Sequence, residues 1–324
     1  MKIAFAGLRH SHIFGLYDRA IEMEGFSVVG AWEADEAART AAKEKMNVPF
    51  YETYEELLAD PNVDAVAVGD YYAARGQLII RALDAGKHVI ADKPICTSLE
   101  ELEIIKTKAT EKKLKLACML DLRYEGAMRT AKKLVEEGRL GKIHAMAFTG
   151  QHPLSYGTRP MWYFEEGKHG GTINDIAIHG IDVLRWITGL NYVKTTAART
   201  WNAYATEVPF FNDCAQLMVE YEGGAGLMAD VSYAAQTASA WNMPSYWRFN
   251  IWGEKGAVEF RYGDDTLVFA DKDSVQPETI ACEKVTENWL HDFAKEYDEA
   301  AVLDVIASSY AALKIQKDAD DANK

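Results

Sequence analysis

Two short segments of this chain carry the residue types that acid–base chemistry needs. Asp92-Lys93-Pro94 follows an apolar run, so Lys93 is expected at the end of a buried strand, with Pro94 restricting the backbone beyond it. Asp175 and His179 are four residues apart in a stretch with helical spacing, which predicts that they share one helix face. A carboxylate beside an imidazole orients the ring and stabilises its protonated form. Taken alone, each segment also fits an ordinary alternative, a solvated lysine or a pair on a helix surface.

A further set of polar and aromatic side chains could bind a small polyol. They offer hydrogen-bond donors and an apolar platform, although each one alone is more often structural. The set comprises Arg123, Gln151, His152, Arg159, Trp162 and Asn174. These side chains predict a polar ligand and nothing finer.

The segment from Gly7 to His12 is a candidate nucleotide-binding loop, because it joins a predicted strand to a predicted helix. Dinucleotide-binding loops follow the pattern GxGxxG, and here Arg9 and His12 replace the second and third glycines. Backbone N–H groups at a helix N-terminus hold a pyrophosphate, and Arg9 adds a positive charge. The alternative is an ordinary strand–helix turn. The residues expected to bind the nucleotide are Gly7, Leu8, Arg9, His10 and His12.

His10 and His12 are also residue types that bind metals. No third ligand lies near them in the sequence, so no metal is expected. The four cysteines are far apart and form no CxxC pair, which predicts neither a zinc ribbon nor a disulfide framework. We therefore expect reduced cysteines in a cytoplasmic protein.

Glu33 is expected at the end of the second strand, 26 positions after Gly7. An acidic side chain there accepts hydrogen bonds from the ribose hydroxyls of an adenosine and repels a 2′-phosphate. This position favours NAD over NADP as the cofactor. The alternative is a carboxylate that caps the next helix.

The first third of the chain alternates apolar runs with segments of helical periodicity. The predicted strands are 2–7, 28–32, 63–68, 87–91 and 114–120, and the predicted helices are 13–23, 36–45, 54–59, 73–85 and 98–113. This alternation predicts an α/β fold with a parallel, doubly wound Rossmann sheet, whose ligands bind beyond the carboxyl ends of the strands. We place this dinucleotide-binding domain at residues 1–121.

The remaining residues, 122–324, predict an α+β domain with a mostly antiparallel open sheet, for substrate binding and oligomerisation. Strands are expected at 143–150, 192–201, 213–222, 225–234, 246–253, 256–262 and 266–270, and helices at 126–137, 173–187 and 286–317. Such a sheet usually has one face to cover, so we expect a homodimer or homotetramer through this sheet.

Composition excludes several classes of partner. The formal net charge is −14 at pH 7, and an acidic surface repels phosphate backbones and anionic lipid. No apolar stretch approaches the length of about 18 residues that a membrane-spanning helix needs. Neither a nucleic acid nor a membrane is therefore an expected partner.

Several of these segments together resemble the Gfo/Idh/MocA family, which includes glucose–fructose oxidoreductases and inositol dehydrogenases. The most specific are Ala85-Gly86-Lys87-His88-Val89 with its following Lys93-Pro94, and Gly170-Gly171 with the Asp175 and His179 that follow. The resemblance covers residues 1 to about 190 and continues loosely beyond.

The resemblance implies roles for individual residues. The family's lysine falls on Lys93 and binds the reacting oxygen beside the nicotinamide, and its acid–base histidine falls on His179. Asp175 would hold the substrate or tune this pair. Asp92 stands where the family usually has glutamate, and the loop with Asp70 and Tyr72 departs from the usual Thr-Pro-Asn. That loop normally lines the cofactor, so Asp70, Tyr72 and Asp92 are expected cofactor contacts.

These observations predict an NAD(H)-dependent oxidoreductase acting on a CH–OH or C=O carbon of a sugar, cyclitol or related polyol. Three alternatives remain on the same fold. They are a non-catalytic NAD-linked sensor, a lyase- or glycosidase-type enzyme that recycles its cofactor, and a reductase for aromatic dihydrodiols or imines.

Overall fold

The structure is a computed structural model that describes residues 1–323, and it divides into two compact units. Unit 1 consists of Met1–Met119, Pro160–Gly170 and Asn288–Ile306, and unit 2 of Leu120–Arg159, Gly171–Glu287 and Ala307–Lys324. Each unit has its own sheet, so the two are described separately.

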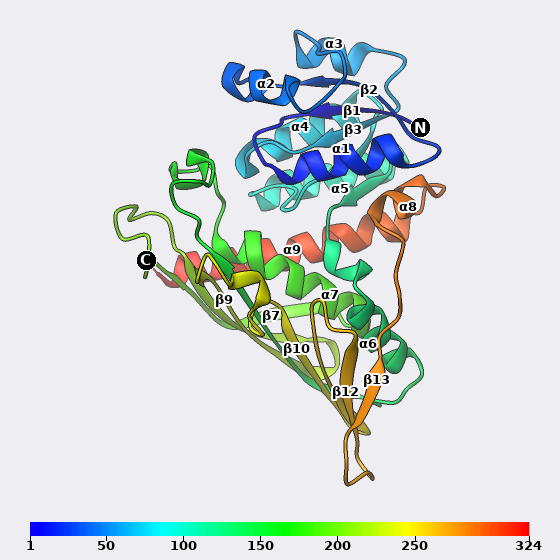
Figure 1. The fold of residues 1–324 in the computed structure, drawn as a ribbon, viewed down its shortest axis with the longest axis vertical. Helices are drawn as coiled ribbons and strands as arrows, with labels where there is room; N and C mark the ends of the chain where they lie inside the picture. The colour runs from blue at the N-terminus through cyan, green and yellow to red at the C-terminus, as the bar shows by residue number, and fades with distance from the viewer. Residues whose placement is uncertain (324) are drawn as a thin grey trace. The chain divides into compact units, whose positions relative to one another are not determined.

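Unit 1 contains a parallel sheet of five strands in the order β2-β1-β3-β4-β5 (Figure 1). The strands are β1 (Lys2–Ala6), β2 (Ser27–Trp32), β3 (Ala65–Val68), β4 (His88–Ala91) and β5 (Leu116–Cys118). β1, β3 and β4 are almost fully buried, as expected for parallel strands with helices on both faces. The predicted Rossmann sheet is confirmed.

The helices of unit 1 begin and end close to the predicted positions. They are α1 (His12–Glu22), α2 (Glu36–Lys43), α3 (Tyr54–Ala59), α4 (Tyr72–Asp84) and α5 (Leu99–Glu111), followed later in the chain by a 3₁₀ turn, η2 (Met161–Phe164), and α8 (Trp289–Ala294). The apolar stripe of α1, with Ile13, Leu16 and Ala20, is buried, which is why its period of 3.6 was readable in the sequence.

The strand order of unit 1 locates its ligand crevice. β1 lies between β2 and β3. The chain therefore runs from β1 to β2 on one side and then crosses to β3 on the other side of β1. In open α/β sheets, ligands bind outside the carboxyl ends of the strands at such a reversal. The loops after β1 and β3, which contain Gly7 and Asp70, therefore form the expected nucleotide site.

Unit 2 contains an eight-stranded sheet in the order β13-β12-β11-β10-β6-β9-β8-β7 (Figure 1). Its strands are β6 (Ile143–Pro153), β7 (Tyr192–Trp201), β8 (Cys214–Tyr221), β9 (Ala225–Ala235), β10 (Arg248–Gly253), β11 (Gly256–Arg261), β12 (Thr266–Asp271) and β13 (Glu278–Ala281). All neighbours are antiparallel except β6 and β9. The predicted, mostly antiparallel sheet is confirmed, although β13 was not predicted.

The helices of unit 2 correct two sequence-based expectations. They include α6 (Gly126–Glu136) and α7 (Ile178–Thr188), with 3₁₀ turns η1 (Asp121–Tyr124), η4 (Glu222–Gly224) and η5 (Ala240–Asn242). The helix expected from residue 173 begins instead as a π-helix, η3 (Ile173–Ala177). The single helix expected over 286–317 is two, α8 and α9 (Glu299–Ala322), separated by a short non-helical segment.

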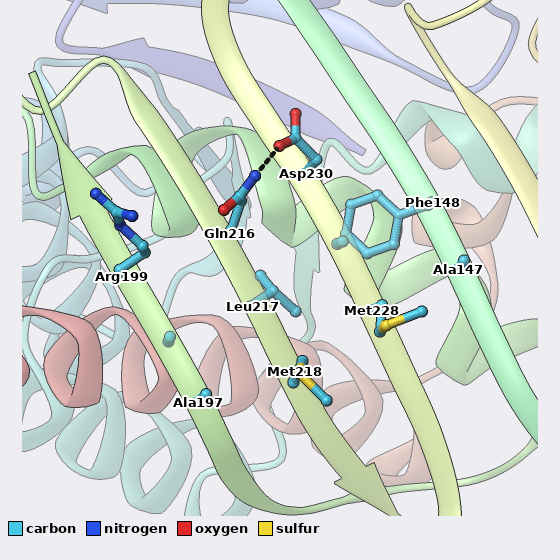
Figure 2. Close-up of a pocket in the computed structure, with 11 residues that line it drawn as sticks. Ala147, Phe148, Ala197, Arg199, Gln216, Leu217, Met218, Met228 and Asp230 are labelled. Atoms are coloured by element: carbon cyan, nitrogen blue, oxygen red, sulfur yellow. Dashed lines mark hydrogen bonds between the residues drawn. The ribbon is translucent and has the colours of Figure 1, made fainter. Parts of the chain in front are cut away.

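One face of the unit 2 sheet carries exposed apolar side chains. In β8, buried residues alternate with the exposed Gln216 and Met218, and in β9 Met228 is 56% exposed. These side chains line a shallow depression across β6, β9, β8 and β7, with Arg199 at one side and Asp230 accepting a hydrogen bond from Gln216 at 2.7 Å (Figure 2). Within residues 1–323, helices of membrane-spanning length and apolarity are absent.

Candidate active site

Gly7 follows β1 and has a backbone conformation that only glycine adopts readily. Its φ is +71°, and an added Cβ would lie 2.5 Å from the Cβ of Asp70. This close approach brings the loop after β1 against the loop after β3. The first glycine of the degenerate pattern therefore has a steric function that the other two positions lack.

Arg9 is the positive centre of the nucleotide loop. Its Nε lies 2.7 Å from Asp70 and 3.4 Å from Glu33, and its guanidinium lies 4.5 Å from the centre of the Tyr71 ring. Burial alone would lower the pKa of Arg9, but the charges of Asp70 and Glu33 raise it above its ordinary value. Burial raises the pKa values of both carboxylates, and Arg9 opposes that shift.

Glu33 holds the nucleotide loop from the end of β2. Its buried carboxylate accepts hydrogen bonds from the backbone N–H groups of Leu8 and Asp35, the latter at 2.8 Å. The cap of α2 is Asp35, whose side chain accepts the N–H of Ala38 at 2.9 Å. The capping alternative for Glu33 is therefore wrong.

These residues fit a bound dinucleotide. α1 begins at His12, and the partial positive charge at a helix N-terminus suits a pyrophosphate. Arg9 supplies a positive charge beside this helix end, and Glu33 supplies an acceptor at the end of β2. The replacement of two glycines by Arg9 and His12 leaves this geometry in place.

A chain of hydrogen bonds runs from the nucleotide loop into the core of unit 1. His10 Nδ1 bonds to the Asp92 carboxylate, and its Nε2 lies 2.7 Å from the hydroxyl of Tyr163. That hydroxyl lies 2.7 Å from the hydroxyl of Tyr72. All four side chains are buried. Burial lowers the pKa of His10 to about 3, so the ring is neutral near pH 7.

Arg75 is a fully buried cation that organises the end of β4. Its Nη2 lies 3.0 Å from Asp92, its Nη1 donates to the carbonyl oxygen of Lys93 at 2.5 Å, and its Nε donates to that of Asp70 at 2.7 Å. Burial alone would raise the pKa of Asp92, but Arg75 and His10 hold it well below its ordinary value. Sequence reasoning did not select Arg75, because one arginine in a helical segment carries no signal of burial.

Lys93 lies two residues after the end of β4, as predicted, and the residue is only 6% exposed. Its Nζ lies 5.9 Å from the centre of the Tyr72 ring, and its peptide bond to Pro94 is cis. The alternative of a solvated surface lysine is therefore wrong.

The fold brings a third possible metal-binding group to the two histidines. One atom each of His10, His12 and Asp92 lies within 4.8 Å of the others, and Asp92 comes from 80 residues further along the chain. Arg75 already ion-pairs with this carboxylate, and the two nitrogens of His10 bond to Asp92 and Tyr163. A cation would compete with these bonds, so the geometry favours a hydrogen-bonded cluster.

Trp162 lies in unit 1, against the nucleotide loop. Its indole N–H donates to the carbonyl oxygen of Arg9 at 3.1 Å, and its ring stacks on Tyr163 at 4.1 Å. The sequence suggested Trp162 as a platform for substrate. Its hydrogen bond gives it a direct structural role in holding the loop.

In unit 2, Asp175 and His179 straddle the change from π-helix to α-helix. Asp175 belongs to η3 and His179 to the first turn of α7, and π-turns of this kind are frequent at functional sites. The Asp175 carboxylate accepts the hydroxyl of Tyr233 on β9. Tyr233 is buried and was not predicted, because only the packing of β9 against η3 brings it close.

Aromatic rings lie near two of the three histidines of unit 2, His152 and His179. The Trp247 ring lies 5.6 Å from the His179 ring and 5.3 Å from the His152 ring. Tyr246 lies 5.1 Å from His152. Flat apolar rings beside polar groups suit a polyol, which has both C–H and O–H faces. Trp247 and Tyr246 were also missed, since nothing in their spacing marks them.

The other predicted substrate residues have identifiable internal partners. Arg123 forms a two-pronged ion pair with Asp182. Gln151 donates to Asp230 at 2.5 Å and accepts from Ser232, across β6 and β9. The backbone N–H of Asn174 lies 3.4 Å from the Gln316 side chain. These contacts tie the three residues into unit 2, and their roles toward substrate stay predictions.

Unit 1 thus has the fold and loop chemistry of a dinucleotide-binding protein, and unit 2 carries Asp175, bonded to Tyr233, and His179, beside the Trp247 ring. Comparison with known proteins agrees. Residues 2–120 match the model of the oxidoreductase family with an NAD-binding Rossmann fold, and residues 128–259 match the C-terminal domain model of the same family. The chain belongs to the Gfo/Idh/MocA family of NAD-binding oxidoreductases.

Relatives with described activities share limited identity with this chain. Levoglucosan dehydrogenase of Pseudarthrobacter phenanthrenivorans is 26% identical over 231 residues, which are 64% of this chain and 58% of the relative. Myo-inositol 2-dehydrogenase of Thermotoga maritima is 31% identical over 148 residues, 45% of this chain and 43% of the relative. These matches therefore span about half the length of the relatives. A structure of levoglucosan dehydrogenase with NADH has a TM-score of 0.80 at 18% identity and covers 99% of this chain and 97% of its own, which shows a shared fold.

Proposed function

We propose that this protein is an NAD(H)-dependent dehydrogenase that acts on one CH–OH carbon of a sugar, a cyclitol or a related polyol. Residues 1–121 would bind the cofactor, and residues 122–324 the substrate. The observation that carries the proposal is the position of Lys93, which is 6% exposed and follows β4 at the carboxyl edge of the parallel sheet, where ligands of such sheets bind. The dehydrogenases of levoglucosan and myo-inositol support the substrate class.

In the proposed reaction, His179 removes the proton of the substrate hydroxyl as a general base. Lys93 donates a hydrogen bond to the same oxygen and stabilises the negative charge that develops there. Asp175, held by Tyr233, positions the substrate or the imidazole. NAD, when bound, accepts the hydride.

Glu33 would set the preference for NAD over NADP. Its carboxylate is held by two backbone N–H groups, so the charge has a defined position at the end of β2. We expect Glu33→Gln, whose single amide oxygen can accept one of the two N–H groups, to shift the ratio of Kd values for NADP⁺ and NAD⁺ toward NADP⁺ by about tenfold or more, since a like charge no longer opposes the 2′-phosphate. Isothermal titration with both nucleotides measures this ratio. Glu36→Gln, at an exposed position nearby, is the control and should leave the ratio unchanged.

The exposed apolar face of the unit 2 sheet supports the proposal of a homodimer or homotetramer. Met218 on β8, Met228 on β9 and Trp252 on β10 are each at least 41% exposed, and a second copy of the sheet would cover them. Sedimentation of the purified protein tests the proposal, and a monomer at all concentrations contradicts it. The cysteines Cys96, Cys118, Cys214 and Cys282 are free thiols, which fits the proposed cytoplasmic location.

The decisive experiment for the function is a titration with NAD⁺ and NADP⁺, followed by a screen of polyols and sugars for NADH absorbance. A rise with one class of polyol supports the dehydrogenase and identifies its substrates. Nucleotide binding without any turnover favours an NAD-linked sensor, and bond cleavage without net NADH favours a cofactor-recycling enzyme. The absence of nucleotide binding would contradict the proposal.

A further inference from the structure

A continuous series of titratable side chains in unit 1 connects Tyr72 with His12. The Tyr72 hydroxyl lies 2.7 Å from that of Tyr163, which lies 2.7 Å from His10 Nε2. His10 Nδ1 bonds to Oδ2 of Asp92, and Oδ1 of the same carboxylate lies 3.4 Å from His12 Nδ1. The proposed general base, His179, is not part of this series.

The two ends of the series have different environments. Tyr72 and Asp92 are fully buried, and His10 and Tyr163 are each 3% exposed. The side chain of His12 is 48% exposed, so the series reaches water at this end. At the other end, Tyr72 is the neighbour of Lys93, whose Nζ lies 5.9 Å from the ring centre.

The hydrogen bonds have one consistent direction when His10 is neutral. Its Nδ1–H donates to the Asp92 carboxylate, so its Nε2 accepts the O–H of Tyr163, whose oxygen in turn accepts the O–H of Tyr72. Each hydroxyl both donates and accepts, and the imidazole accepts on one nitrogen and donates from the other. Stepwise proton transfer requires such a series as far as Asp92, and the last step, from Asp92 Oδ1 to His12, spans a 3.4 Å ion pair without a hydrogen bond.

We propose that this series, Tyr72–Tyr163–His10–Asp92–His12, is a proton path between the reacting centre at Lys93 and water. The inference rests on the proposed function, since oxidation of a CH–OH group releases one proton for each hydride transferred. As the substrate O–H bond breaks, the hydride passes to NAD⁺, and the base that took the proton must release it before the next turnover. One proton from the reacting centre enters at Tyr72, and Tyr72, Tyr163 and His10 each pass one proton onward. The Asp92 carboxylate takes up the proton from His10 Nδ1 and passes it to His12, which releases one proton to water. Reduction runs the same transfers in reverse.

The charges around the path suit transfer and oppose storage of the proton. Arg75 ion-pairs with Asp92 at 3.0 Å, so this carboxylate readily gives up a proton that it receives. Burial disfavours the charged form of His10, so the ring transmits a proton between its two nitrogens and does not retain it. Lys93 and His169 are further titratable neighbours, and the His169 ring lies 5.4 Å from both tyrosine rings.

Replacement of His12, the exposed end of the series, tests the path and leaves its buried side chains unchanged. In weakly buffered solution, a stopped-flow experiment follows NADH absorbance and a pH-indicator dye together. We expect proton release to keep pace with NADH formation in the wild-type protein and to lag by about tenfold or more in His12→Ala, with free imidazole restoring it. His144→Ala, at an exposed position of β6, is the matched control and should show no lag.

Tyr163→Phe breaks the path inside the core and keeps the ring. We expect the same lag as in His12→Ala, but free imidazole should not remove it, because the missing hydroxyl is inaccessible. If His12 and Tyr163 had only structural roles, imidazole would not restore proton release in one variant and fail to restore it in the other. Proton release that keeps pace in both variants would overturn the proposal.

Nitrogen NMR of the histidines in the nucleotide-free protein tests the path independently of turnover. We expect His10 to be protonated on Nδ1 and bare on Nε2 near neutral pH, and Asp92→Asn to change this tautomer. A bare Nδ1 in the wild-type protein would overturn the path even if the enzyme is active. If the protein has the expected tautomer but oxidises no polyol, the proposed function is wrong and the hydrogen-bond direction in the series is not.

Discussion

Lys93→Met is expected to lower kcat by about 10²–10³-fold, the cost of removing one donor that stabilises a developing oxyanion. Methionine keeps most of the length and apolar volume of the lysine side chain but removes the ammonium. The residue is only 6% exposed, so a group of similar shape is needed to avoid a cavity. The Arg75 bonds to the backbone carbonyl oxygens of Lys93 and Pro94 do not involve the altered atoms, so the loop should keep its conformation.

The affinity for NAD⁺ separates loss of chemistry from loss of folding. Titration of Lys93→Met should give a Kd close to that of the wild-type protein, while steady-state kinetics give the reduced kcat. Lys106→Met, at a position on α5 with its side chain 39% exposed, is the control and should retain full activity. Normal turnover by Lys93→Met would refute the role of Lys93 in the reaction.

His179→Gln is expected to lower kcat by about 10²–10⁴-fold, the range for removal of a general acid–base group. Glutamine retains a hydrogen-bonding amide but cannot take up the substrate proton. The residue lies in the first turn of α7, where glutamine is a good helix former, and it packs near Trp247. The folded state should therefore persist, which the unchanged near-ultraviolet circular dichroism of the tryptophans would verify.

The pH profile identifies the role of His179. For alcohol oxidation, a general base must be unprotonated, so kcat/KM of the wild-type protein should rise with pH as the base loses its proton. This rise should be absent in His179→Gln. A variant that keeps the rise would show that another group is the base, and His144→Gln serves as the control for loss of a histidine.

Lys93 belongs to unit 1 and His179 to unit 2, so the proposed reaction draws on both parts of the chain. The double variant tests whether they serve the same step. Residues that act as a unit are strongly non-additive, so the double variant should lose far less than the product of the two single losses. A loss equal to that product would indicate independent roles.

Sequence patterns predicted the elements of unit 1 well because those patterns are local. Burial on both faces makes β1, β3 and β4 continuous apolar runs, and one buried stripe gives α1 its helical period. The polar residues that end these strands, Glu33 and Lys93, followed from the same reasoning. η3 was read as regular α-helix because a π-turn differs from it only in hydrogen bonding.

The amino-acid sequence by itself determined the fold class, the Rossmann unit, the family resemblance and the candidates Lys93, Asp175 and His179. Only the tertiary structure decided which side chains meet. His10 bonds to Asp92, 82 residues away, and to Tyr163, 153 residues away. No local pattern encodes such contacts, because they depend on strand order and packing between distant segments. For the same reason, only the structure shows that buried Arg75 bonds to Asp92. It likewise shows that Arg123 and Gln151 bond to residues within unit 2.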